Sequence, residues 1–409
     1  MASPASILSS TSSLWLAVAL LGASVAAAGP LGDTEPGSRG TLGSEPAPDL
    51  AASPPPALGP TPLLGLWEPR LDSGAAAAGD EPETLVATAV GEAAADPAPL
   101  PPDRPVTIAF AGDVHFEGRL AVALADDPNT ALDPVAELVA DADLAIANLE
   151  TAITVRGVPA AKEFNFRAGP DAFVALRAAG IDVVSMANNH GMDYGLVGLQ
   201  DSLAHAAVAG FPVVGIGLDA DSAYAPWSTE VRGQRIAVIG ATQVLDSSLI
   251  AAWTATDDRP GLASAKEVDR LVAAVEAARS DHDTVIVFLH WGIEGETCPA
   301  ARQLELSDRL IEAGADVVVG GHAHRLQGGG RKARALVHYG LGNFVFSTEG
   351  GPGADSGVLL VTVTGPTIAR YEWIPARLQA GVATHLDADR APAAVEAWEQ
   401  LRSCTDLVP

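Results

Sequence analysis

Five short apolar segments of this chain each end in side chains that can bind a metal ion. The segments are 106–111 (VTIAFA), 143–147 (DLAIA), 181–186 (IDVVSM), 284–289 (TVIVFL) and 316–319 (DVVV). Apolar runs of this length predict buried β-strands. Because ligands of open α/β sheets gather at the carboxyl ends of the strands, we expect the polar groups that follow these segments to meet in one place.

Helical patterns between several of these strands predict an α/β layered domain. We expect helices at 171–179, which opens with an acidic residue after Pro170, and at 264–278, which begins with the capping-box pattern of Ser264 and Glu267. Further strands are predicted at 213–216 and 236–239, and a closing β-hairpin at 358–363 and 368–373.

The residues that follow the five strands are suited to holding two metal ions. They are Asp113 and His115, Asn148 and Glu150, Asn189 and His190, His290, and His322 and His324. A single histidine after a strand is more often a hydrogen-bonded loop residue, but five such strand ends are hard to attribute to chance. Two divalent cations need a bridging carboxylate and several imidazole, carboxylate or amide ligands. Mixed nitrogen and oxygen donors favour Zn, Mn or Fe.

The charge of the chain excludes one class of partner. The formal net charge is −27 at pH 7. A nucleic-acid backbone would be repelled by this field, so we expect no nucleic-acid partner. The excess of acid is also what keeps an exported protein soluble.

The first hundred residues predict export. Residues 14–28 (LWLAVALLGASVAAA) form an apolar run with A-x-A-like cleavage sites, which is typical of a signal peptide, although residues 1–13 contain no Lys or Arg. We therefore expect a signal peptide or N-terminal anchor at 1–28 and an extracellular or cell-surface location. A disordered, acidic linker rich in Pro, Ala and Gly is expected at 29–104.

The sequence constrains the remaining domain boundaries and the pairing of the cysteines less tightly. We expect the main domain at 105–378 and a C-terminal helical tail at 379–409. Cys298 and Cys404 are the only cysteines, and a disulfide between them stays open at this point.

At the polar strand ends the sequence resembles the CapA family of poly-γ-glutamate capsule synthesis proteins, a branch of the calcineurin-like metallophosphatase superfamily. The matching segments are FAGDVHFEGR (110–119), ANLET (147–151), FNFRAGP (164–170), ANNHGMDYG (187–195), HWGIE (290–294), GADVVVGGHAHRLQ (314–327) and YGLGNFVFS (339–347). The resemblance covers most of residues 105–375 and implies a four-layer α/β/β/α sandwich.

The resemblance also assigns roles to residues. One ion would bind Asp113, His115, Glu150 and His324, and the other Glu150, Asn189, His290 and His322. His190 would be catalytic. Arg119 and Arg167 would clamp phosphate or a glutamyl carboxylate, with a loop-bracing role equally open. Asn148 and Glu294 would contact the ligands rather than the ions, although for Glu294 a solvated loop acid is the other interpretation.

Three departures from the superfamily pattern stand out. His115 occupies a position that is apolar in many CapA members, so the metallophosphatase pattern is more complete here. Glu150 replaces the usual bridging Asp, a change that lengthens the arm and alters metal spacing. Gly321 replaces the histidine or similar residue often found before the final His-x-His.

Three functions are compatible with these features. The first is a metal-dependent hydrolase or transferase acting on an anionic cell-envelope polymer, with a membrane-bound polymer synthetase as a partner. The second is a phosphoesterase acting on a nucleotide or other phosphorylated small molecule. The third is a non-catalytic assembly or transport factor in which metals hold the fold. A catalytic neighbour such as His190 argues against the third, because a structural site needs none.

Overall fold

The computed structural model of the chain describes residues 104–348 and 350–409. The signal segment expected at 1–28 and nearly all of the linker expected at 29–104 lie outside the described residues. Within the described part, no helix has both the length and the apolar character that crossing a bilayer requires.

The larger of two main sheets has eight strands in the order β15-β18-β17-β16-β1-β2-β5-β6, and β15 also pairs with β1. Strands β1, β2, β5 and β6 run parallel, so their carboxyl ends lie at one edge. The strands are β1 (Val106–Val114), β2 (Leu144–Leu149), β5 (Val183–Ser185), β6 (Val213–Val214), β15 (Asn343–Val345), β16 (Asp355–Thr364), β17 (Thr367–Gln379) and β18 (Val382–His385). The predicted closing hairpin is present as the antiparallel pair β16 and β17.

The second sheet has six strands in the order β13-β14-β12-β11-β9-β8. Its strands β9, β11, β12 and β14 are parallel. The strands are β8 (Trp227–Val231), β9 (Gln234–Thr242), β11 (Thr284–Trp291), β12 (Val317–His322), β13 (Gly329–Lys332) and β14 (Ala335–His338). Two small pairs complete the strands: β3 (Ala152–Ile153) with β4 (Arg167–Ala168), and β7 (Ile216–Gly217) with β10 (Gly261–Leu262).

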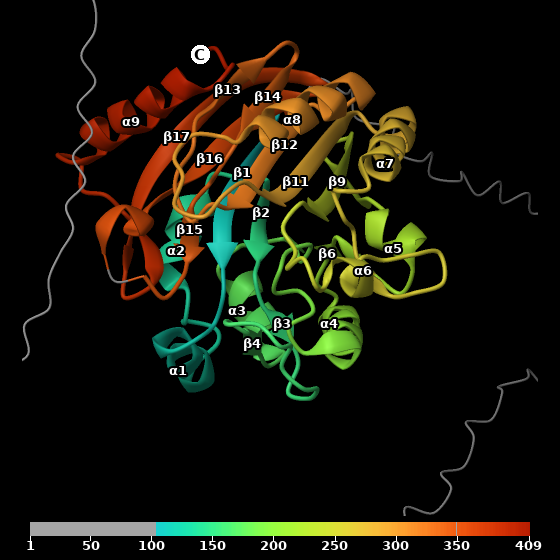
Figure 1. Cartoon of the computed structure of the whole chain (residues 1–409). Helices are drawn as coiled ribbons and strands as arrows, with labels where there is room; N and C mark the ends of the chain where they lie inside the picture. Colours follow the sequence, from blue (N-terminus) through green and yellow to red (C-terminus); the bar gives the residue numbers. More distant parts are fainter. Residues whose placement is uncertain (1–103, 349) are drawn as a thin grey trace, which may run out of the picture. The chain divides into compact units, whose positions relative to one another are not determined.

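The two sheets face each other across a shared hydrophobic core, and helices cover their outer faces (Figure 1). Against the large sheet pack α1 (Arg119–Asp126), α2 (Asp133–Val139), α3 (Asp171–Ala178), α4 (Gly195–Ala209) and α6 (Ile250–Trp253). Against the second sheet pack α5 (Ala220–Tyr224), α7 (Val268–Asp281) and α8 (Ala301–Ala313). This arrangement confirms the four-layer α/β/β/α sandwich.

The strands are apolar on both faces because both faces are buried. In β1, Ile108 and Phe110 enter the core between the sheets, whereas Ala109 and Ala111 pack against the helical layer. This alternation has the period of two that a β-strand imposes, and central parallel strands of α/β proteins share it. Short continuous apolar runs therefore identified these strands correctly.

The capping box expected at Ser264 is wrong. Helix α7 begins at Val268, and Glu267 at its N-cap makes no side-chain cap. Ser264 instead forms a parallel bridge with Thr242, and its backbone N–H donates to the Tyr224 hydroxyl at 2.9 Å. Extended pairing at Ser264 leaves it unable to start the helix, so the helix begins after this bridge.

The segment 379–409, expected as a helical tail, is built into the domain. It contains α9 (Ala391–Gln400) and the 3-10 turn η2 (Leu401–Cys404), but also β18, which pairs with β17 and β15. A second 3-10 turn, η1 (Gly351–Ala354), precedes β16. Trp398 of α9 fills the core between the sheets. A disulfide joins Cys298 to Cys404 and ties the end of the chain to the loop after β11.

His338, at the end of β14, is a buried histidine packed between two tryptophans. Its ring stacks on Trp373 and Trp398, and its Nε2 accepts a hydrogen bond from Trp398 Nε1 at 2.9 Å. Burial, with the positive charge of Arg402, lowers the pKa of His338 from 6.5 to about 3. The unfolded chain therefore binds a proton that the folded chain excludes as the pH falls below the unfolded pKa.

We expect the free energy of unfolding to decrease as the pH falls from about 6.5 toward 3, because only the unfolded chain protonates His338. The decrease is up to about 1.4 kcal/mol per pH unit. Replacing His338 by Gln should reduce the stability lost between pH 7 and pH 5 by about 2 kcal/mol. Urea unfolding of both proteins at the two pH values measures this difference. The exposed His385→Gln serves as control, and equal acid sensitivity of His338→Gln and the parent would contradict the assignment.

Candidate metal centre

The two sheets bring their polar strand ends to one place. Asp113 in β1 is in register with Asn148 in β2, and His322 in β12 is in register with Trp291, next to His290. The backbone N–H of His322 donates to Asp113 Oδ2 at 3.0 Å, which links the large sheet to the second sheet. The expected convergence of segments far apart in sequence is therefore present as geometry.

Asn148 holds the centre together. Its Nδ2 lies 2.8 Å from Asp113 Oδ1, 3.2 Å from Glu150 Oε1 and 3.0 Å from His290 Nδ1. Its Oδ1 accepts a hydrogen bond from Asn188 Nδ2 at 3.1 Å. Asn148 thus contacts three candidate ligands through one nitrogen, and the resemblance implied contacts with ligands at this residue.

Two carboxylates share this buried centre. Asp113 and Glu150 have no exposed surface. Burial raises the pKa of Glu150 well above its usual range, and the charge and hydrogen bond of Asp113 add to that effect. Burial opposes ionisation of Asp113 too, but hydrogen bonds from His324, Asn148 and the His322 N–H hold its pKa below the usual value. Without a cation, the pair cannot carry two charges at low cost.

Two buried histidines, His290 and His322, also lie at the centre. Nε2 of His290 lies 2.6 Å from Asn189 Oδ1, so these two atoms are directed at each other. Burial, then the neighbouring His322 and His324, lowers the pKa of His290 well below its usual value. Burial lowers the pKa of His322 to about 4. Neutral imidazoles are the form that binds metals.

His324 lies within 4.0 Å of both carboxylates. Its Nδ1 lies 3.2 Å from Asp113 Oδ2 and 2.8 Å from Asn343 Oδ1, while its Nε2 lies 4.0 Å from Glu150 Oε2. Burial alone would lower the pKa of His324, but the hydrogen bond and charge of Asp113 raise it overall. Its backbone has a positive φ of 51°, and that of His322 a φ of 90°. Such strained backbone is found at functional sites.

His190 is held by an ion pair that the sequence did not reveal. Its Nδ1 lies 2.7 Å from Asp193 Oδ2, and Asp193 Oδ1 lies 2.6 Å from Lys162 Nζ. Lys162 Nζ also donates to the backbone oxygen of Asn189. Burial is the main cause of the lowered pKa of His190, and Asp193 opposes it. The carboxylate of Asp193 favours the tautomer with the proton on Nδ1, which leaves Nε2 for proton exchange.

His115 makes its hydrogen-bond and ring contacts with the backbone and with phenylalanines, not with the other expected ligands. Its Nδ1 faces the backbone N–H of Glu117 and its Nε2 that of Ser347, both at 3.0 Å, and the tautomer decides which of the two contacts is the hydrogen bond. Its ring stacks on Phe166 at 4.7 Å, and Phe166 stacks in turn on His190 at 4.1 Å. Burial, then the charge of His190, lowers the pKa of His115 to about 3. Both ring nitrogens thus already face the backbone.

The two candidate anion clamps lie near the surface. Arg119 is the first residue of α1 and is exposed. The guanidinium of Arg167 lies 4.7 Å from the Tyr194 ring, and its backbone N–H donates to Glu117 Oε1 at 3.0 Å. Arg167 also lines a surface cavity of about 300 Å³ together with Phe116, the neighbour of His115.

Several residues of the centre were not predicted. Asp193 and Asn343 lie inside matching segments, ANNHGMDYG and YGLGNFVFS, so their polar character within those segments was the available signal. Lys162 lies two residues before FNFRAGP, and nothing local distinguishes it from a surface lysine. Its role depends on Asp193, which is distant in sequence.

The residues present fit metal ions. Among the described histidines, cysteines and acids, two groups could hold a cation: Asp113, Glu150 and His324, and Glu294, His322 and His324. Glu150 Oε2 and His322 Nδ1 are buried polar atoms that have no hydrogen-bond partner in the described chain. Unpaired buried polar atoms are costly, and a cation would satisfy both.

Gly321 allows Asp113 to enter the centre. A Cβ atom at residue 321 would lie 2.1 Å from Asp113 Oδ1, whereas one at Gly169 would meet nothing within 4 Å. We expect Gly321→Ala to displace the Asp113 carboxylate and weaken metal binding by about 10-fold or more. Metal content after dialysis, with Gly169→Ala as control, measures this effect. Full metal retention in Gly321→Ala would show that Asp113 is not a ligand.

Comparison with known proteins places the chain. The sequence model of a family described as bacterial capsule synthesis protein PGA_cap matches residues 107–348. The capsule biosynthesis protein CapA of Bacillus anthracis is 30% identical over 236 residues, 56% of this chain and 56% of that protein. The PGA biosynthesis protein CapA of Bacillus subtilis is 28% identical over 278 residues, 67% of this chain and 72% of that protein.

A probable polyglutamine synthesis accessory protein of Mycobacterium tuberculosis is 34% identical over 236 residues, 55% of this chain and 62% of that protein. The chain thus spans little more than half of the Bacillus anthracis relative.

Among solved structures, a hypothetical protein of Thermus thermophilus has a TM-score of 0.43 and 18% identity, covering 67% of this chain and 100% of that chain. A 5′-nucleotidase of Candida albicans has a TM-score of 0.40 and 12% identity, covering 73% and 57%. These TM-scores are too low to carry an argument.

Proposed function

Since the chain belongs to the bacterial capsule synthesis PGA_cap family, we propose that it is an exported metal-dependent hydrolase or transferase that acts on an anionic polymer of the cell envelope, poly-γ-glutamate. A membrane-bound polymer synthetase is its proposed partner, in keeping with relatives described as biosynthesis or accessory proteins. The observation that carries the proposal is the convergence of buried carboxylates, imidazoles and an amide around unpaired Glu150 Oε2 and His322 Nδ1.

Seven side chains were expected to hold two divalent cations, and six of them contact one another. Asp113, Glu150 and His324 would hold one ion, and Glu150, Asn189, His290 and His322 the other. Such ions supply Lewis acidity and generate a nucleophile near neutral pH. Zn, Mn or Fe suits this set of nitrogen and oxygen donors.

His190 would handle the proton of the reaction. Asp193 holds its Nδ1–H, so Nε2 is the nitrogen that accepts a proton or returns one to the leaving group. Lys162 forms an ion pair with Asp193 and so holds the carboxylate in place beside the imidazole. Asp193 and Lys162 act through His190 and are positioning residues.

The charge of the substrate sets a condition on the site. The chain carries a net charge of −27, which repels a polyanion at a distance. Local positive charge from the cations would attract glutamyl carboxylates at the centre itself. Arg167, exposed beside the cavity that it shares with Phe116, is the proposed clamp for a carboxylate farther along the polymer, and Arg119 is proposed for the same role.

A direct test uses purified protein loaded with Mn²⁺ or Zn²⁺. We expect about two ions per chain and shortening or transfer of poly-γ-glutamate, measured by size-exclusion chromatography. His190→Ala should lower the rate by about 10²- to 10⁴-fold while both ions are retained, because it removes proton transfer and not metal binding. The exposed His385→Ala is the matched control.

The other outcomes separate the remaining functions. Hydrolysis of a phosphomonoester or phosphodiester, with the polymer left intact, would identify a phosphoesterase. Two bound ions with no activity toward either substrate would identify an assembly factor. Fewer than one ion per chain would overturn the metal centre.

Export is supported by the apolar segment 14–28 and by the Cys298–Cys404 disulfide, since disulfides persist mainly outside the cytoplasm. We expect the full chain, expressed in bacteria, to react with a thiol reagent only after reduction. A chain without residues 1–28 should stay inside the cell and show two reactive thiols. Cytoplasmic recovery of the full chain with both thiols reactive would contradict export.

A further inference from the structure

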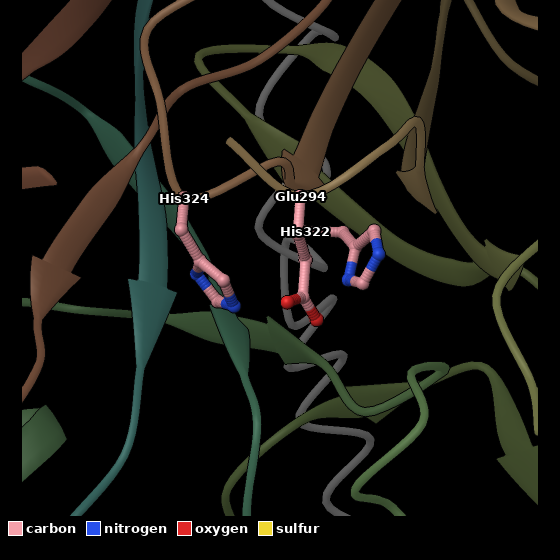
Figure 2. Close-up of side chains that lie close together, drawn as sticks. All are labelled: Glu294, His322 and His324. Atoms are coloured by element: carbon pink, nitrogen blue, oxygen red, sulfur yellow. The ribbon is translucent and has the colours of Figure 1, made fainter. Parts of the chain in front are cut away.

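Glu294 is an exposed acid beside the metal centre for which the expected ligand set has no place. It follows β11 on the loop that leads to α8. Its carboxylate and one nitrogen each of His322 and His324 all lie within 4.8 Å of one another. Figure 2 shows the carboxylate lying between the two imidazoles, with a nitrogen of His322 facing it.

A buried atom with no partner points to a ligand at this position. His322 is only 6% exposed, and its Nδ1 has no hydrogen-bond partner in the described part of the chain. A buried nitrogen without a partner is costly unless an ion or water binds it. His322 and Glu294 therefore offer unfilled donor atoms on the same side of the centre.

The loop of Glu294 is anchored at three points, which hold the backbone next to Glu294 beside the His322–His324 segment. The backbone N–H of Gly295 donates to the oxygen of Ala323, between His322 and His324, at 2.9 Å. Buried Gln327 donates to the backbone oxygen of Glu296 at 3.0 Å. The third anchor, the disulfide of Cys298, joins the loop to the C-terminal segment.

The engagement of His115 leaves a ligand missing from the expected set. Each of its two nitrogens faces a backbone N–H at 3.0 Å, of which the neutral ring can accept one, and the rings of Phe166 and Phe346 pack against it. Binding a cation through either nitrogen of His115 would displace the backbone N–H that faces it. Glu294 requires no such change, because its carboxylate already lies beside His322 and His324.

Charge balance agrees with a third carboxylate. Asp113, Glu150 and Glu294 each group with His324, so three carboxyl groups meet around one imidazole. Carboxylates this close repel one another unless cations lie between them. Two divalent cations would offset the three charges and leave a small positive excess, which suits an anionic substrate.

We infer that Glu294 is a direct ligand of one of the two cations, at the position beside His322 and His324, and that His115 braces the site instead of binding metal. The inference rests on the proposed metal centre but names a donor that the superfamily pattern does not include. The ligand class is a divalent transition-metal ion bound by mixed imidazole and carboxylate donors.

The test measures metal binding directly and does not depend on activity. The full chain is stripped of metal and titrated calorimetrically with Mn²⁺ and Zn²⁺, and the visible spectrum of the Co²⁺-loaded chain is recorded. Glu294→Gln should weaken one of two binding events by at least about 10-fold and change the Co²⁺ spectrum. Glu294→Asp, which keeps the charge but shortens the arm, should also weaken that event.

Two control variants isolate ligation from charge and from His115. Glu296→Gln removes the same charge from an exposed position of the same loop and should leave both events unchanged. His115→Gln should retain two ions, with circular dichroism used to verify folding. Equal losses in Glu294→Gln and Glu296→Gln, or loss of an ion in His115→Gln alone, would overturn the inference.

Failure of this inference can be distinguished from failure of the proposed function. If the parent chain binds no metal, both the inference and the proposed function fail. If the parent binds two ions and Glu294→Gln binds them equally well, only the role of Glu294 fails.

Discussion

The burial of Asp113 and Glu150 in one centre is the constraint on which the rest of the structure depends. Burying two carboxylates close together costs free energy, because each loses its contact with water and the two repel each other. The hydrogen bonds that Asn148 makes to both do not offset this cost alone. The chain keeps them there by joining the two sheets through the His322 N–H and Asp113. Such an arrangement is costly for folding alone, and bound cations would offset that cost.

The sheets explain how residues more than two hundred positions apart reach this centre. Parallel strands of the large sheet end at Asp113, Asn148 and the 188–190 segment, and those of the second sheet end at His290 and His322. Glycine at 321 supplies the clearance for Asp113 at the junction. The same four-layer packing that buries the apolar faces of the strands therefore leaves their polar ends facing one another.

Much of this arrangement could be predicted from the sequence, because it depends on local patterns. Continuous apolar runs identify strands that are buried on both faces, and polar residues at their ends identify the edge where a ligand binds. Six of the seven expected ligands lie in mutual contact for this reason. The start of helix α7 was not predictable, since the bridge of Ser264 to Thr242 overrides its local capping pattern.

Other features depend on contacts that no local pattern records. The orientation of His115 is set by Phe166, Phe346 and two backbone amides, all supplied by the folded chain. The ion pair of Lys162 with Asp193 and the disulfide of Cys298 with Cys404 likewise join distant segments. The sequence around Glu294 is typical of a solvated loop, and only the anchors of that loop place the acid beside His322.

The most direct test of the central claim is an anomalous-diffraction experiment on crystals of the chain grown with Mn²⁺. The account predicts two anomalous peaks about 3.5–4 Å apart, both within bonding distance of Glu150. A single peak, or peaks remote from Glu150, would contradict the claim that cations compensate the buried carboxylates of this centre.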